Sequence, residues 1–419
     1  MSWEKVKLED VCLSISDGDH QAPPKVDNGI PFVTISNINS TNKFDLSEVM
    51  YVPQEYYDHL DSKRKPQKED ILYSVVGSFG IPVYIDCDEK FVFQRHIAIL
   101  RPDSKKIVSK FLYYVMLGRE FYLQADAVAV GAAQRTVSLT ALRDMTVNVP
   151  SMETQKKIAD ILSAYDKLIE NNQKQIKLLE EAVQRLYKEW FVDLRFPGHE
   201  DVKIIDGVPE GWERVCLSNF IEYEIGGGWG DDIPNRENPN QAYVIRGTDM
   251  LGITHGEINS LPLRYHGETN LMKRELQAGD IIFEVSGGSK NEGVAKCTLI
   301  TSQLLNYLHK PVMCASFCKL IRPIRNHSNY LHDCLKYLRA SGRTSEYDKR
   351  SASSIVNYRW KDFLTQEKIL FIPNDILERY NDMSSKIHSK IMTHSLQIEL
   401  LKQARDRLLP KLISGEIQV

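Results

Sequence analysis

The sequence predicts an α+β fold in which two mostly-β globular domains, arranged as a tandem pseudo-repeat, are each followed by a long helix. Two observations predict it. A heptad pattern of apolar residues marks a segment in the middle of the chain, and nearly the whole first half of the sequence is repeated in the second half. The length of 419 residues also exceeds what one ordinary core supports, which favours two or three domains.

The first long helix is predicted from Pro150 to about Leu194. Apolar residues recur there at alternating steps of four and three, which places them in one narrow seam, as in a coiled coil. The seam comprises Ile158, Leu162, Tyr165, Ile169, Ile176, Leu179, Val183, Leu186 and Trp190, interrupted by Asn172. Acidic and basic residues nearly cancel on this helix. It is therefore predicted to be a spacer, roughly 50–60 Å long, and not a basic rod that coats a polyanion.

A second long helix is predicted from Pro373 to the end of the sequence. The segment QIELLKQARDRLL, which starts at Gln397, matches QIKLLEEAVQRLY, which starts 222 positions earlier at Gln175. At the same offset Asn172 corresponds to His394, so each helix carries a polar position in its seam. Such a position fixes the register of a coiled coil at some cost in stability. The alternative is two unrelated amphipathic helices, each packed on its own domain.

The globular domains repeat in the same order as the helices. The opening SWEKVKLEDVCLSI is repeated as GWERVCLSNFIE, GIPFVTISNIN as AYVIRGTDM, EDILYSVVGSFG as GDIIFEVSGGSK, HIAILRP as FCKLIRP, and VNVP as LFIP. We therefore expect a first domain over 1–150, a first helix over 151–196, a second domain over 197–373 and a second helix over 374–419.

Short apolar runs bounded by Gly, Pro and Asp predict the strands. In the first domain these runs are ILYSVV, PVYIDC, FVFQRHIAIL and MTVNVP, rich in β-branched and aromatic residues. The segment IVSKFLYYVMLGREFYLQA has apolar residues at i, i+3 and i+4 from Val108 onward, which predicts a helix. Each domain is thus expected to be mostly β with one or two helices.

Composition and motifs exclude several classes of function. The sequence has no apolar run long enough to span a membrane and no signal peptide, and its seven cysteines are scattered, so we expect free thiols in a reducing cytoplasm. Motifs for a nucleotide cofactor, a phosphate loop, an amino-methyltransferase and a zinc site are missing; Val294 stands where a phosphate loop requires Lys. Asp103 weakly resembles a nuclease carboxylate, but no second carboxylate is spaced to share a metal. The sequence predicts no catalytic residue, metal site or cofactor in this chain.

Donor-rich loops at repeated positions provide the candidate DNA-binding residues. In the first domain they are Ser74, Gly77, Ser78, Phe79, Gln134, Arg135 and Thr136. In the second they are Ser286, Gly287, Ser289, Lys290, Arg343, Lys349, Arg350, Ser353, Asn357, Tyr358 and Arg359. Glycine lets backbone N–H groups approach phosphates, and Gln, Asn and Arg can read adenine or guanine in the major groove. The alternative is ordinary polar loops with a glycine at each tight turn. Because the net charge is −3, a basic surface would have to be local.

Two segments resemble a known family. The sequence between Gln155 and Asp193, QKKIADILSAYDKLIENN…LYKEWFVDL, and the terminal RDRLLPKLISGEIQV resemble the specificity subunit (HsdS) of type I restriction–modification systems. The WE-x-V-x-L and WERVCL openings and the EDI and GDI turns agree with this resemblance, which spans essentially all 419 residues.

The resemblance implies that each globular domain is a target recognition domain for one half of a split, asymmetric site on double-stranded DNA. It also implies that the long helices form an intramolecular antiparallel coiled coil. The implied partners are two methyltransferase (M) subunits, which carry S-adenosylmethionine, and restriction and translocation (R) subunits, with no membrane involved. Candidate docking surfaces are Leu186, Tyr187, Trp190, Phe191 and the tail Leu408–Ile417, with burial in the chain's own coiled coil as the alternative.

Two rival functions remain open from the sequence. One is a self-contained DNA methyltransferase or nuclease, against which the missing cofactor motifs argue. The other is a purely structural coiled-coil linker, against which two elaborate domains argue.

Overall fold

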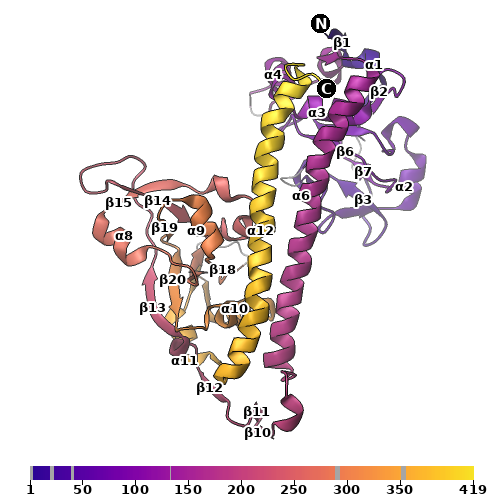
Figure 1. Cartoon of the computed structure of the whole chain (residues 1–419). Helices are drawn as coiled ribbons and strands as arrows, with labels where there is room; N and C mark the ends of the chain where they lie inside the picture. The colour runs from indigo at the N-terminus through magenta and orange to yellow at the C-terminus, as the bar shows by residue number, and fades with distance from the viewer. Residues whose placement is uncertain (1–2, 19–22, 39–41, 133, 288–292, 351–354) are drawn as a thin grey trace. The chain divides into compact units, whose positions relative to one another are not determined.

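The computed structural model describes residues 3–18, 23–38, 42–132, 134–287, 293–350 and 355–419, which fall into two compact units (Figure 1). The first unit comprises residues 1–167 and 403–419, and the second comprises residues 168–402. Each unit contains one globular domain and a part of both long helices. Within the described residues, no helix combines the length and the apolar character that a membrane span needs.

The first unit is built on a four-stranded antiparallel sheet with the strand order β2-β8-β5-β6. These strands are Cys12–Asp17 (β2), Ile97–Pro102 (β8), Ile71–Ser74 (β5) and Pro82–Tyr84 (β6). A smaller sheet has the order β4-β3-β7 and contains Met50–Val52 (β4), Ile30–Val33 (β3) and Val92–Phe93 (β7). Glu4–Lys7 (β1) pairs with Thr146–Val149 (β9), which leads directly into the first long helix.

Short helices cover these sheets and complete the core of the first unit. They are Leu8–Val11 (α1), Gln54–His59 (α2), Ser109–Leu117 (α3), Arg119–Val128 (α4) and Leu139–Asp144 (α5). The helix predicted from Val108 is broken at Gly118, whose backbone is extended, so that α3 and α4 are separate. Tyr114 and Phe121, one from each helix, pack in the same buried cluster as Ile158 and Leu162 of the long helix.

The second unit repeats the sheets of the first in the same order. Its four-stranded sheet is β13-β20-β16-β18, its three-stranded sheet is β15-β14-β19, and β12 pairs with β23. The strands are Glu213–Cys216 (β12), Ile221–Gly226 (β13), Asn240–Ile245 (β14), Leu263–His266 (β15), Ile281–Glu284 (β16), Cys297–Leu299 (β18), Val312–Cys314 (β19), Cys318–Pro323 (β20) and Lys368–Phe371 (β23). Even the irregular pairing of β2 with β8, between Cys12 and Ser14, has a counterpart between Ile221 and Tyr223 of β13. The predicted tandem repeat is confirmed.

Further helices and strands complete the second unit. Its helices are Met250–Thr254 (α7), Glu268–Arg274 (α8), Ser302–Leu308 (α9), Ser328–Ala340 (α10) and Trp360–Gln366 (α11). Ile204–Ile205 (β10) and Val208–Pro209 (β11) form a small hairpin, and a sheet of order β17-β22-β21 joins Ser286–Gly287 (β17), Val356–Tyr358 (β22) and Asp348–Arg350 (β21).

One buried ion pair recurs at the same place in both domains. Asp70 precedes β5 and accepts hydrogen bonds from Arg101 Nε and Nη2, at 3.0 and 2.8 Å. Asp280 precedes β16 and accepts from Arg322 Nε and Nη2, both at 2.8 Å. Each aspartate also accepts the backbone N–H of the residue three positions earlier. The repeated EDI and GDI motifs therefore mark a turn held by a buried carboxylate and an arginine.

The two long helices are Met152–Tyr187 (α6, 36 residues) and Asn374–Ile413 (α12, 40 residues). In the second unit, Asn172 contacts His394, and the Tyr187 ring lies 6.5 Å from the Tyr380 ring. Between these two contacts the residue number rises from 172 to 187 along α6 and falls from 394 to 380 along α12, so the helices are antiparallel (Figure 1). The first unit has the same arrangement: Asp166 of α6 pairs with Arg405 of α12 at 2.8 Å. The predicted intramolecular coiled coil is confirmed.

The polar position of the seam lies at the centre of a local two-fold relation between the helices. Asn172 and His394 are equivalent in the sequence repeat, and they also contact each other, with 2.6 Å between Asn172 Oδ1 and His394 Nδ1. Repeat-equivalent residues of antiparallel helices meet only at the midpoint of the pairing. Ile169, Ile176, Ile391 and Ile398 surround this pair in one buried cluster. The pair is therefore satisfied in an apolar layer, as a register-fixing position requires.

The C-terminal end of the first long helix is not an exposed docking surface. A π-helical turn, Lys188–Val192, follows α6, and Tyr187, Trp190 and Phe191 are 5%, 6% and 4% exposed. Their rings pack against Tyr330 and Tyr380 in the core of the second unit. The interpretation of these three side chains as docking residues was wrong, because the turn directs them into the adjacent domain. In the C-terminal tail, Leu412 is also buried, in the core of the first unit.

Candidate nucleic-acid interface

In the first unit, two predicted loops meet and form what we call the first loop set: Gly77, Ser78, Phe79, Gln134, Arg135 and Thr136. The N–H of Gly77 donates to the carbonyl of Arg135 at 2.9 Å. The backbone of Thr136 forms isolated antiparallel β-bridges with Val76 and with Val130. Gly77 has a φ of +71°, a left-handed conformation that favours glycine. The glycine thus permits the turn that brings the strand end after β5 beside residues 134–136.

The side chain of Arg135 is held by an aromatic stack and a carboxylate. Its guanidinium lies 5.3 Å from the centre of the Phe79 ring, which stacks on Tyr122 at 5.9 Å with 7° between the ring planes. Arg135 Nη1 also donates to Asp126 Oδ1 at 2.5 Å. The Arg135 side chain remains 43% exposed. It is a planar cation with a restricted set of orientations, which lowers the entropy lost when it binds a base or a phosphate.

Sequence reasoning missed Tyr122 and Asp126, which support Arg135 from helix α4. They are four residues apart and therefore lie on one face of the helix. The four-residue spacing can be read from the sequence, but the contacts of these two side chains with Arg135 and Phe79 cannot.

In the second unit, the equivalent segments form the second loop set: Ser286, Gly287, Lys349, Arg350 and Asn357. Ser286 pairs with Asn357 and Gly287 with Val356, while Lys349 pairs with Asn357 and Arg350 with Val356 on the other side. The Ser286 hydroxyl donates to Asn357 Oδ1 at 2.9 Å. The Asn357 and Lys349 side chains are exposed, so an amide and an ammonium group are displayed on neighbouring strands.

Several predicted residues belong to the framework. Ser74 is fully buried, and its Oγ accepts the N–H of Ile81 at 2.9 Å, which closes the turn after β5. Tyr358 is 8% exposed, and burial raises the pKa of its phenol. Arg359 bonds the carbonyl of Glu346 and pairs with Asp362. These three side chains support the loops and are left out of the proposed surface.

Arg343 neutralises a buried carboxylate. Its Nε lies 2.9 Å from Oε1 of Glu367, which is 1% exposed, and the Tyr347 hydroxyl donates to Glu367 Oε2 at 3.1 Å. The hydrogen bond to Glu367 raises the pKa of Arg343, and burial with that carboxylate nearby raises the pKa of Tyr347 to about 12. The Arg343 charge is thus already paired with a carboxylate of its own domain. The remaining predicted residues, Ser289, Lys290 and Ser353, lie outside the described residues.

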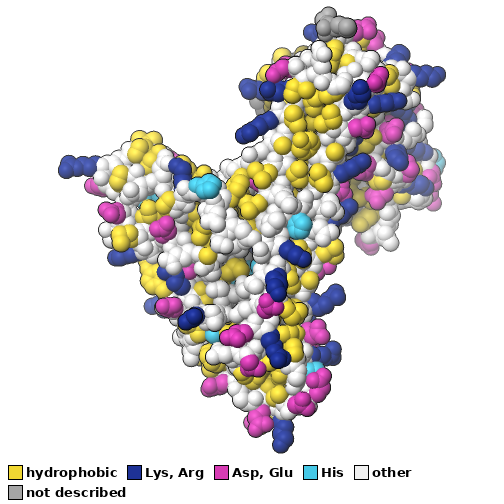
Figure 2. All heavy atoms as spheres, viewed as in Figure 1, with side chains coloured by type: hydrophobic (Ala, Val, Ile, Leu, Met, Phe, Trp, Pro, Cys, Tyr) yellow, Lys and Arg dark blue, Asp and Glu magenta, His cyan; other side chains and the backbone are white. Residues whose placement is uncertain are grey.

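The surface charge is mixed. On the face shown in Figure 2, Lys and Arg side chains are interspersed with Asp and Glu side chains on both units. This distribution agrees with the net charge of −3. Any attraction to a polyanion must therefore come from local groups such as those of the two loop sets.

The chain thus consists of two α+β domains in tandem with a pair of antiparallel helices, and polar loops lie at the same place in each domain. A model of the type I restriction modification DNA specificity domain matches residues 1–181. The MjaIX specificity subunit of Methanocaldococcus jannaschii is 28% identical, with 75% of this chain and 70% of the relative covered. The HindI specificity subunit of Haemophilus influenzae is 22% identical, with 99% of each covered.

A solved structure shows the same fold. The S subunit of the type I restriction–modification system of M. genitalium superposes with a TM-score of 0.59 at 14% identity, over 98% of this chain and 96% of that one. The chain belongs to the family of type I restriction–modification specificity subunits. It is therefore a non-catalytic subunit of such a system.

Proposed function

We propose that this specificity subunit reads a bipartite, asymmetric target on double-stranded DNA, one half with each loop set, and holds the M and R subunits of its complex. The functional division would follow residues 1–150 and 197–373 for the two recognition domains and 151–196 and 374–419 for the helices. The chain would hold no cofactor itself, with S-adenosylmethionine bound by the M subunits. The relatives named above are specificity subunits, which supports this role.

The observation that carries the proposal is the equivalence of the two loop sets. In each set, one segment follows an inner strand of the four-stranded sheet, β5 or β16, and pairs with a second segment that precedes α5 or α11. Their side chains nevertheless differ: Phe79, Gln134 and Arg135 stand in one set, and Ser286, Lys349 and Asn357 in the other. Equivalent positions with different donors would read two different half-sites, which is what an asymmetric target requires.

Co-expression tests the proposal directly. The chain would be expressed with the methyltransferase encoded beside it, the mass of the purified complex measured by light scattering, and the methylated adenines mapped on random-sequence DNA. We expect a complex with two methyltransferases that modifies one split motif. A monomer that binds no methyltransferase and confers no specificity would contradict the proposal while leaving the fold unchanged.

Arg135→Ala is expected to weaken recognition at one half-site and not at the other. Loss of a base contact costs about 1–3 kcal/mol and relaxes specificity at that position, whereas loss of a phosphate contact weakens binding to all sequences equally. Methylation rates would be measured on targets with single-base changes in either half. Asn357→Ala should affect the opposite half, and Arg119→Ala, an exposed arginine of α4 outside the loop set, should leave both unchanged. Equal loss on every sequence would make Arg135 a phosphate contact.

A further inference from the structure

Three metal-ligating side chains come together in the second unit. His332 and Asp333 are neighbours on α10, and His388 is on α12. Asp333 Oδ1 lies 3.0 Å from His332 Nδ1 and 2.8 Å from His388 Nε2, and the three potential ligand atoms all lie within 4.8 Å of one another. The residues are 6%, 0% and 8% exposed. Two imidazoles thus converge on one buried carboxylate oxygen.

The other oxygen of this carboxylate is held separately. The Tyr380 hydroxyl donates to Asp333 Oδ2 at 2.7 Å, and Tyr380 is itself fully buried among the rings that follow α6. Outer hydrogen bonds of this kind orient a ligating carboxylate and are a regular part of metal sites. They leave Asp333 Oδ1 directed at the two imidazoles.

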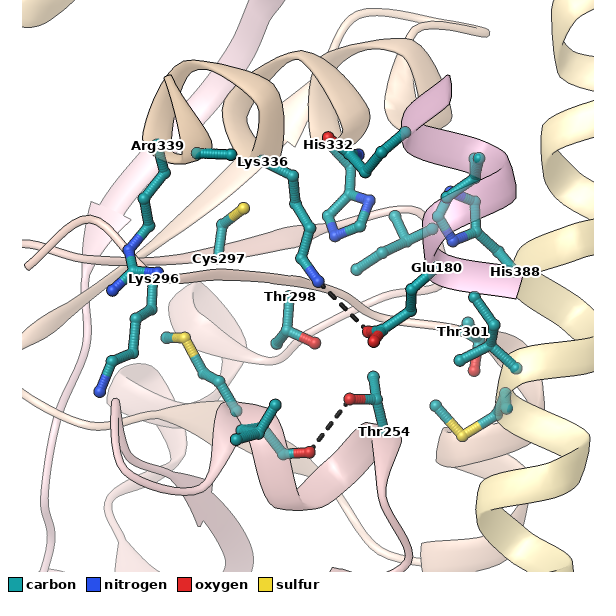
Figure 3. Close-up of a pocket in the computed structure, with 18 of the residues that line it drawn as sticks. Glu180, Thr254, Lys296, Cys297, Thr298, Thr301, His332, Lys336, Arg339 and His388 are labelled. Atoms are coloured by element: carbon teal, nitrogen blue, oxygen red, sulfur yellow. Dashed lines mark hydrogen bonds and ion pairs between the residues drawn. The ribbon is translucent and has the colours of Figure 1, made fainter. Parts of the chain in front are cut away.

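The cluster borders a cavity. His332 and His388 line a cavity of about 600 Å³ whose other walls come from α6, α7, β18, α10 and α12. Figure 3 shows the His332 and His388 rings directed into it from α10 and α12. A cation could reach the cluster through this space, and a water molecule could complete its coordination from the cavity side.

We propose that His332, Asp333 and His388 bind a divalent transition-metal ion, with Zn²⁺ as the ion that this set of ligands fits best. Two imidazole nitrogens and one carboxylate oxygen, with a position left for water, are a common zinc environment. Ligands at about 2.0–2.2 Å in a tetrahedron are about 3.3 Å apart. The two pairs that include Asp333 Oδ1, at 3.0 and 2.8 Å, therefore need to separate by about 0.3 and 0.5 Å. The two imidazole nitrogens, which lie within 4.8 Å of each other, need to approach by up to about 1.5 Å. Each imidazole would ligate through the nitrogen that faces Asp333 and carry its hydrogen on the other.

Three cationic side chains, Lys296, Lys336 and Arg339, line the same cavity. Lys336 lies one helical turn after His332 and lines the same cavity, but its Nζ is 3.4 Å from Glu180 Oε1 of α6. The bound ion would tie α10 to α12 within the second unit. The sequence gives no sign of the site because His388 lies 55 positions after Asp333, and only the packing of α12 on α10 brings them together.

The test is metal binding by the full chain after treatment with a chelator. Zn²⁺ would be titrated in competition with a chromogenic chelator, and Co²⁺ binding followed by its visible absorption. The wild type should bind a single equivalent, with a Co²⁺ spectrum of nitrogen and oxygen ligands, and Zn²⁺ should raise its thermal midpoint. His388→Gln should abolish stoichiometric binding. Tyr380→Phe, which removes the outer hydrogen bond, should lower the affinity about 10–100-fold.

His394→Gln is the matched control, since it makes the same change on the same helix at a histidine that contacts Asn172 instead. It should bind Zn²⁺ as the wild type does. A wild-type chain that binds neither Zn²⁺ nor Co²⁺ would overturn the proposal and leave the cluster as a hydrogen-bonded link between α10 and α12. Unchanged binding by His388→Gln, or a sulfur-to-cobalt charge-transfer band, would also overturn it. If His388→Gln does not fold, the wild-type spectrum and midpoint still decide the question.

Discussion

Deletion of residues 168–174, one heptad, from α6 alone is expected to abolish the ability of the chain to form a functional complex with its methyltransferase. The helix is anchored at two places: Asp166 pairs with Arg405 in the first unit, and Tyr187 packs with Tyr380 in the second. Seven residues of helix span about 10 Å. With α12 intact, the shortened α6 cannot satisfy both anchors, so either the seam or the aromatic core must be disrupted.

A matched deletion separates register from length. Residues 392–398 of α12 lie opposite the deleted heptad, and they include His394, the partner of Asn172. Removing both heptads restores the match between the anchors, although the bonds of Ser395 to Gly256 and Ile253 are lost. The double deletion should recover more complex formation and methylation than the single one. If the helices set the gap in the target, the recovered motif should have a gap about three base pairs shorter.

Co-purification with the methyltransferase and mapping of methylated sites would measure both variants, with circular dichroism as the check on folding. Full activity of the single deletion would refute the pairing of α6 with α12 as a requirement for function.

The long helices could be predicted in detail because the patterns that indicate them can be read directly from the sequence. A heptad pattern needs only the sequence of one helix, and the correspondence of Asn172 with His394 needs only the repeat. The repeat also predicted that loops 74–80 and 134–136 would have counterparts near 286 and 357. These inferences depend on spacing and similarity, which the sequence contains in full.

The features that could not be predicted depend on contacts between distant segments. The break at Gly118 is an example. A Cβ there would lie 2.6 Å from Ile413 Cδ1 of α12 and 3.0 Å from the carbonyl of Val115, so close packing on a distant helix accompanies the break between α3 and α4. Similarly, Ser74 is of a residue type that often contacts DNA, but its side chain is buried. Arg343 is also of such a type, but it pairs with Glu367, which lies 24 positions later in the sequence. Polar type alone does not distinguish a surface donor from a framework donor.

Arg322→Met is expected to lower the free energy of unfolding by about 3–5 kcal/mol, because it leaves a buried carboxylate without its cation. Asp280 is 1% exposed, whereas the Arg322 side chain is 27% exposed. Loss of the arginine should therefore destabilise the protein more than loss of the aspartate. Without Arg322 the Asp280 carboxylate cannot reach water and keeps only the hydrogen bond from the Gln277 N–H among the described residues. Methionine preserves most of the arginine stem volume, so the expected loss reports the charge and not a cavity.

Denaturant unfolding followed by tryptophan fluorescence would measure this change, since Trp190, Trp212 and Trp360 lie in the core of the second unit. Arg325→Met makes the same substitution at an exposed position three residues later and should change stability by less than about 0.5 kcal/mol. The double variant Asp280→Asn with Arg322→Met removes both charges and should be less destabilised than Arg322→Met alone. Equal stability of Arg322→Met and Arg325→Met would show that the pair does not stabilise the turn.

In the first domain, Arg101 also donates to the carbonyl of Lys65 at 2.9 Å. Arg101→Met should therefore cost at least as much, because it leaves the Asp70 carboxylate without its cation and also removes the hydrogen bond to the Lys65 carbonyl.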